Sequence, residues 1–138
     1  MSPVPDVRVQ RILVVVDDPA TCMEAFAWTE RLASAFGAKV WVLRGVAGSG
    51  GGPDPLLEAE RGLELALERA GLDRMGARPL VHTGSVLEHL PAAINLLGPD
   101  LVLMPRLVEG RNAADAVPTD GPALLLLSCG PTEGTALP

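Results

Sequence analysis

The feature that most constrains the fold of this chain is a set of short apolar runs without the alternation of a half-exposed strand. Residues 11–16 read Arg-Ile-Leu-Val-Val-Val, and further runs follow at residues 39–46, 78–82, 101–104 and 123–127, of which the run at 78–82 is the weakest. A continuous β-branched run is typical of a strand buried on both faces of a parallel sheet, because helices cover both sides of such a sheet. We therefore expect five strands in one sheet.

The segments between these runs have the spacing of amphipathic helices. Apolar residues recur at helical spacing within residues 20–36, and residues 56–70 form one apolar stripe opposite a row of glutamates. Asp54 followed by Pro55 is typical of a helix start, and Gly71 is typical of a helix end. Strands that alternate with helices predict an α/β fold, a doubly wound parallel sheet with right-handed crossovers and helices on both faces.

The third helix has two alternative starts. Ser85 and Glu88 have the spacing of a capping box, which predicts a helix that begins at Ser85. Pro91 lacks the backbone N–H of a helix interior, and its ring clashes with the preceding turn. Either the helix kinks at Pro91 or it begins near that residue, and Gly98 ends it. Residues 105–121 hold charges, Gly, Asn and Pro, with room for only a short helix around residues 111–117.

The charge balance and the hydropathy exclude several partners. Seventeen acidic residues against eleven basic ones give a net charge of -6, which repels nucleic acids and anionic lipid surfaces. No apolar stretch approaches the ~20 residues of a membrane-spanning helix, and the N-terminal residues lack the pattern of a signal peptide. We expect a cytoplasmic protein with no nucleic-acid partner and no membrane partner.

The length of 138 residues fits one domain with one sizeable core. We place this domain at residues 9–128, between flexible termini at residues 1–8 and 129–138. Cys22 and Cys129 lie far apart in the sequence and have no metal-binding spacing, so we expect free buried thiols.

The patterns that would indicate catalysis are weak. His82 and His89, the only histidines, lack the i, i+4 spacing of helical metal sites. Ser85 is not part of a GxSxG elbow. Asp17 and Asp18 point to opposite faces if they continue a strand, so a shared Mg²⁺ would need a turn. We expect no catalytic residue, no metal site and no enzymatic activity.

The ordered set of motifs resembles the universal stress protein family. Residues 11–17 are similar to the family's first strand with its terminal Asp, and residues 37–43 are similar to its Gly-Ala turn and second strand. Residues 84–104 resemble its third helix and fourth strand, and residues 122–127 its proline-led last strand. Val86 departs from this pattern, because it stands where the family has the proline of Gly-x-Pro.

The resemblance, which spans roughly residues 9–128, implies a Rossmann-like sheet of five parallel strands in the order 3-2-1-4-5. It also implies a homodimer paired along the last strand. An apolar strand at the edge of a sheet is usually paired or covered, which agrees with this dimer.

In one branch of the family, ATP binds at the ends of the first and fourth strands, against a Gly-x2-Gly-x9-Gly-Ser/Thr loop. The glycines let backbone amides approach the phosphates. Here Pro105 and Val108 stand at the first two glycine positions, and only seventeen residues separate Met104 from Pro122. Gly45 stands where the family has a valine that lines the adenine. We therefore expect the phosphate-binding half of the loop to be missing.

Four residues remain as candidates for nucleotide binding: Asp17, Met104, Arg106 and Gly110. By resemblance, Asp17 matches the carboxylate near the adenine and ribose, although an Asp at a strand end also caps helices and turns. Met104 directly precedes the altered loop. Arg106, together with Arg111, offers charge in place of lost backbone donors, unless both are solvated arginines. Gly110 either preserves close backbone approach or is an ordinary loop glycine.

Three functions follow as alternatives. The leading one is a non-catalytic, dimeric binding or regulatory module that acts with an unknown protein partner, uses no cofactor and does not bind ATP tightly. The second is a member that binds ATP or AMP with Mg through a rebuilt phosphate loop. The third is a small ATP-hydrolysing enzyme, for which the sequence offers no nucleophile or general base.

Overall fold

A computed structural model of the chain describes residues 9–16, 23–46, 55–108 and 111–127. Five strands form one parallel sheet, namely β1 (Arg11–Val16), β2 (Lys39–Val46), β3 (Arg78–Thr83), β4 (Leu101–Pro105) and β7 (Ala123–Leu127). Their spatial order is β3-β2-β1-β4-β7. Because β7 is the fifth strand of the sheet along the chain, this order confirms the expected 3-2-1-4-5 arrangement.

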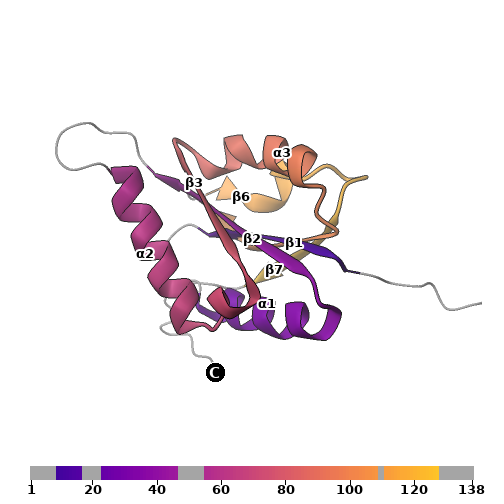
Figure 1. Cartoon of the computed structure of the whole chain (residues 1–138). Coiled ribbons are helices and arrows are strands. Elements are labelled where there is room, and N and C mark those ends of the chain that lie inside the picture. Colours follow the sequence, from indigo (N-terminus) through magenta and orange to yellow (C-terminus); the bar gives the residue numbers. More distant parts are fainter. Residues whose placement is uncertain (1–8, 17–22, 47–54, 109–110, 128–138) are drawn as a thin grey trace, which may run out of the picture.

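Helices cover both faces of the sheet (Figure 1). The helices α1 (Met23–Phe36) and α2 (Pro55–Arg69) pack on one face, and α3 (Val86–Leu97) packs on the other with the short 3-10 helix η3 (Ala113–Ala116). A further 3-10 turn, η2 (Asp73–Met75), leads from α2 into β3. This distribution is what right-handed crossovers produce when the winding direction reverses between β3 and β4.

The central strand β1 explains why its sequence does not alternate. Residues 12–16 are all fully buried. Ile12, Val14 and Val16 face the cluster under α1 and α2, whereas Leu13 and Val15 face the cluster under α3. Burial of each of these side chains contributes about 1.5–3 kcal/mol. Both faces must therefore be apolar, as the run at residues 11–16 predicts.

The helix α3 settles the choice between the two predicted starts. It begins at Val86 with Ser85 at the N-cap position, so Pro91 lies inside the helix rather than at its start. The side chain of Ser85 makes no capping hydrogen bond, which corrects that part of the capping-box prediction. Gly98 ends the helix as expected, and its N–H donates to the carbonyl of Ile94 over 2.9 Å.

The segment after β4 differs from its prediction. It contains the short antiparallel pair β5 (Leu107–Val108) and β6 (Arg111–Asn112), which is followed by η3. The helix expected around residues 111–117 is therefore limited to one 3-10 turn, and Arg111 lies in a strand. The Asn112 side chain, at the N-cap of η3, accepts a hydrogen bond from the Ala114 N–H at 3.3 Å, which fixes where the turn begins.

Several sequence predictions fall outside the described residues. These are the start of the first helix at residues 20–22, the cap at Asp54, both cysteines and the terminal segments. The boundaries of the domain at residues 9–128 also stay a prediction. Within the part of the chain that the structure describes, no helix is long and apolar enough to cross a bilayer.

Candidate functional site

In a doubly wound sheet, ligands bind at the carboxyl ends of the strands, where the winding direction changes. In this chain that point lies between β1, which ends at Val16, and β4, which ends at Pro105. Asp17 and Gly110 lie outside the described residues. Met104 and Arg106 are therefore the two predicted site residues that the structure places.

Met104 contributes to the core. Its side chain is fully buried in the cluster under α3, and it lies in register with Leu126 on β7. A side chain in this position stabilises the end of β4 through packing.

Arg106 is exposed, but its backbone is fully engaged. Its N–H donates to the carbonyl of Leu127 over 3.0 Å, and its carbonyl accepts from the N–H of Ala113 at 3.0 Å. The first bond extends the pairing of β4 with β7, and the second ties η3 to the end of β4. The first amide after β4 is therefore already satisfied, and Arg106 can offer an anion only its guanidinium group.

The rest of this segment is anchored by packing. Val108 and Ala113 are fully buried in the cluster under α3. The register of β5 and β6 pairs Val108 with Arg111. A paired and anchored hairpin of this kind uses its own backbone groups, whereas a glycine-rich phosphate loop leaves its amides free for the ligand.

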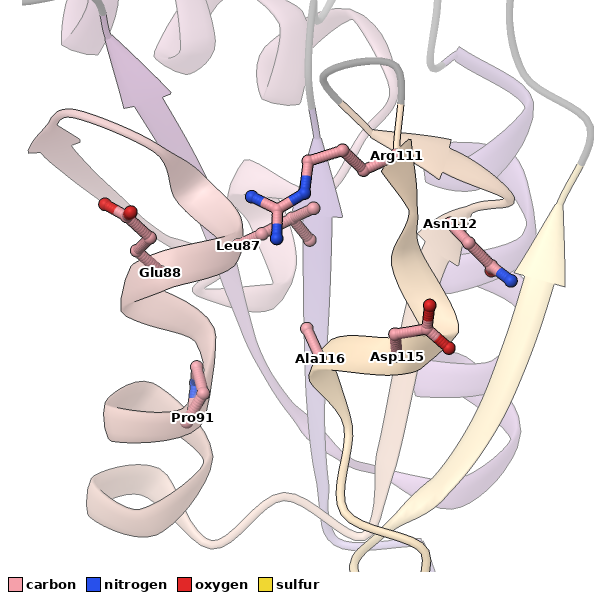
Figure 2. A pocket seen from close by; sticks show the side chains of 7 residues that line it. All are labelled: Leu87, Glu88, Pro91, Arg111, Asn112, Asp115 and Ala116. Carbon is pink, nitrogen blue, oxygen red and sulfur yellow. The ribbon is translucent and has the colours of Figure 1, made fainter.

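A pocket of about 270 Å³ lies between α3 and the segment of β6 and η3. The residues that line it are Leu87, Glu88, Pro91, Arg111, Asn112, Asp115 and Ala116. Figure 2 shows Arg111 reaching from β6 toward Leu87 on α3, whereas Glu88 points away from β6. Among the described residues that line the pocket, Arg111 is the one cation, which is little positive charge for a triphosphate.

The end of β2 is closed by the turn that leads into α3. A Cβ atom at Gly45 would lie 2.5 Å from the Gly84 carbonyl oxygen and 2.7 Å from the Val86 nitrogen. The Gly84 N–H donates to the carbonyl of Val46 over 2.7 Å, which holds the turn in place. No valine fits at position 45 in this arrangement, so the departure noted in the sequence has a steric cause.

Comparison with models of known protein families gives a match, which ends where the hairpin segment begins. Residues 8–106 match the model of the universal stress protein family. The chain belongs to this family. The match ends at Arg106, where the hairpin segment begins. No curated protein is a significant match to the sequence.

Solved structures of other universal stress proteins share the fold. One in complex with cAMP is 15% identical, with a TM-score of 0.65, and the alignment covers 88% of this chain and 98% of that one. One from Archaeoglobus fulgidus in complex with dAMP is 16% identical, with a TM-score of 0.61 and coverage of 87% and 98%. A family member from Arabidopsis thaliana with AMP bound is 14% identical, with a TM-score of 0.56 and coverage of 86% and 90%.

The two histidines of this universal stress protein come together, which sequence spacing did not indicate. Their rings stack with centroids 4.7 Å apart and an interplanar angle of 23°. His89 Nε2 lies 2.9 Å from the Thr83 carbonyl oxygen, so this nitrogen is the donor. Gly84, with φ of 100°, turns the chain back between β3 and α3 and so brings the rings together.

The stacked rings do not form a metal site. A metal ion binds an imidazole nitrogen in the plane of the ring, and two nearly parallel rings have no common point in their planes nearby. Among the residues with described positions, no group of three or more His, Cys, Asp or Glu side chains could hold a metal ion.

Arg44 on β2 is a polar residue that the sequence analysis missed. It lies in register with Val16 at the end of β1 and is partly buried. One guanidinium nitrogen, Nη1, donates to the carbonyl of Ala59 on α2 over 3.4 Å, and its Nε is buried with no hydrogen-bond partner among the described residues. An arginine that follows four apolar residues within a strand is the signal that could have drawn attention to it.

Proposed function

We propose that this universal stress protein is a non-catalytic binding module in which a short hairpin replaces the triphosphate-binding half of the family's nucleotide site. The observation that carries the proposal is the backbone of Arg106, whose N–H and carbonyl are bonded to Leu127 and Ala113. A triphosphate needs several free backbone donors in a close loop. This segment uses the corresponding groups to hold β7 and η3.

Two further observations support the same proposal. Among the described residues that line the pocket beside the hairpin, one cation, Arg111, stands with the acidic residue Asp115, so the pocket has little positive charge to hold a polyanion. The family match ends at Arg106 and does not extend over the hairpin segment.

The proposal that the protein is non-catalytic rests on the contacts of the two histidines, which are the candidate general bases. A general base must reach the proton that it removes from a reacting group. His89 uses Nε2 to donate to the carbonyl of Thr83, and its ring stacks on His82. Both histidines therefore have structural contacts at the start of α3.

A mononucleotide such as AMP or cAMP is the second candidate ligand. Solved relatives hold cAMP, dAMP and AMP, each with a single phosphate group. One phosphate needs fewer donors than three, and an arginine can supply them in bidentate form. Arg111 extends over the pocket beside the hairpin and is placed to supply such a contact (Figure 2).

Calorimetric titration with Mg-ATP, AMP and cAMP tests these proposals. We expect no binding of Mg-ATP tighter than about 1 mM, which corresponds to roughly -4 kcal/mol. A micromolar dissociation constant for Mg-ATP would overturn the leading proposal. Binding of AMP or cAMP that Arg111→Met weakens about tenfold, while the exposed control Arg61→Met leaves it unchanged, would favour the second candidate.

We also propose that the protein forms a homodimer along β7. This strand lies at the end of the sheet order, and Leu124, Leu125 and Leu126 on it are only half-buried. Apolar edge strands are usually paired or covered. Light scattering should give twice the mass of one chain at micromolar concentration, and a Leu125→Lys variant should give the mass of a monomer. A wild-type monomer would contradict the dimer.

A further inference from the structure

A second pocket lies at the amino ends of β2 and β3, the opposite edge of the sheet from the switch point between β1 and β4. Its volume is about 330 Å³. The residues that line it are Lys39, Val40, Trp41, Met75, Gly76 and Arg78. A pocket of this size lies at the lower end of the range that holds small organic ligands.

The strand register brings two cations of this pocket together. Trp41 on β2 pairs with Arg78 on β3, and in parallel strands residues in register point to the same face. Lys39 lies two positions before Trp41 and so shares that face. Lys39 and Arg78 are diagonal neighbours on adjacent strands, close enough for their long side chains to reach one anion between them.

Apolar groups form the rest of the wall. Trp41 is half-buried and packs against the cluster under α3, so one part of its indole is fixed while another part lines the pocket. Val40 and Met75 belong to the cluster under α1 and α2, on the opposite face of the sheet from Trp41, and reach the pocket at the amino edge. An indole held in this way offers a flat surface for stacking.

The charge of this pocket is opposite to that of the chain. No carboxylate among the residues with described positions lines it, although the protein has a net charge of -6. The acidic side chains near η2 line a separate pocket, which contains Glu64, Glu68 and Asp73. Asp100, which directly precedes β4, accepts the N–H groups of Gln10 and Arg11 at 2.7 and 3.0 Å.

From these observations we propose that the amino-edge pocket binds a small organic anion, with a carboxylate or phosphate group on a flat apolar body. The anionic group lies between Lys39 and Arg78, and the flat body stacks against Trp41, which shares their face of the sheet. Charge-assisted hydrogen bonds favour the anion, and the indole favours a planar group over an inorganic ion. This site does not depend on the function proposed for the carboxyl edge.

Tryptophan fluorescence gives a direct test, because the chain has only two tryptophans. Trp28 lies on α1 and is 42% exposed, so Trp28→Phe leaves Trp41 as the single reporter. Titration of this variant with phenyl phosphate and with benzoate should change the Trp41 emission and saturate. The two probes distinguish a phosphate ligand from a carboxylate ligand. Neutral benzamide and inorganic phosphate should each bind at least tenfold more weakly than the better probe.

Matched variants separate the pocket from general charge effects. Lys39→Met with Arg78→Met should weaken the better probe at least tenfold, whereas Arg31→Met with Arg61→Met removes two exposed cations elsewhere and should change nothing. Arg111→Met should also leave this binding unchanged, which separates it from any nucleotide binding at the other edge. Circular dichroism checks that each variant folds. Amide chemical shifts check that the probe binds near Gly76 and Arg78.

Three outcomes would overturn the proposal. The first is the absence of a saturable change with either probe. The second is equal binding of benzamide, which would make the pocket merely apolar. The third is equal loss of affinity in the Arg31 and Arg61 control, which would assign the binding to overall charge.

Discussion

Two of the connections between neighbouring parallel strands of this protein are built in different ways. Between β1 and β2 the chain passes through α1, a helix of 14 residues that buries Phe26 and Ala33 against the sheet. Between β4 and β7 it passes through a two-residue hairpin pair and the single turn η3. Parallel strands usually need an α-helical connection, because the chain must return to the starting edge.

The comparison shows that the second connection needs little structure to keep β7 in the sheet. Five register pairs join β4 to β7, beginning with Leu101 and Ala123, and the hairpin adds the buried Val108 and Ala113. β7 is therefore held by its pairing with β4 and by these buried residues, with no α-helix among the described residues between the two strands.

The largest expected effect lies in the first connection. Phe26→Ala should lower the free energy of unfolding by about 3–5 kcal/mol, because it removes a fully buried aromatic side chain and leaves a cavity. Chemical denaturation followed by circular dichroism measures this change. The exposed control Phe36→Ala, in the same helix, should cost much less, and equal losses would show that burial of Phe26 is not what anchors α1.

Gly45→Val tests how rigidly the turn between β3 and α3 packs against the end of β2. The new side chain meets the backbone of Gly84 and Val86, so we expect a loss of about 1–3 kcal/mol. Gly62→Val, where a Cβ has open space, controls for the change of glycine to valine in general, although it adds the helix propensity of valine. A Gly45→Val protein of unchanged stability would show that the turn is mobile.

Val108→Ala addresses the second connection. Removal of two methyl groups from this buried side chain should cost about 1–2 kcal/mol, roughly 0.8 kcal/mol for each. This loss is smaller than that for Phe26→Ala because the substitution removes fewer buried carbon atoms. A loss above that of Phe26→Ala, measured in the same denaturation experiment, would reverse the comparison between the two connections.

Asn112→Ala should have the smallest effect. It removes the hydrogen bond from Ala114 N–H to Asn112 Oδ1, which is long at 3.3 Å, so we expect about 0.5 kcal/mol, the lower end for loss of a helix cap. Asn112→Asp keeps an acceptor in the same place and should restore most of the stability. A large loss in Asn112→Ala would show that η3 anchors β7 more strongly than its contacts indicate.

The parts of the fold that local pattern determines could be predicted from the sequence. The run at residues 11–16 is apolar on both faces because β1 is central, and this alone identifies the sheet type. Gly98 ends α3 where predicted. Pro91 was harder to interpret, because packing of Leu87 and Leu90 against the sheet stabilises a helix that contains it.

The missed features depend on contacts between distant residues. Gly45 meets Gly84 and Val86 only after β2 and β3 pair, and Arg44 meets Ala59 only after α2 folds onto the sheet. The His82 and His89 rings stack because a single residue turns the chain between them, which periodicity does not encode. The hairpin pair of β5 and β6 likewise has too few residues to give a recognisable pattern.

The bond from the Arg106 amide to the Leu127 carbonyl also makes that amide a reporter of motion. Local openings of a native protein expose amides to deuterium at rates that reveal which unit detaches first. If β7 and the hairpin detach together before the rest of the sheet, the Arg106 amide should exchange much faster than those in the middle of β1. In that case β7 and the hairpin would detach as one unit. Dimerisation along β7 would then slow deuterium uptake at the Arg106 amide.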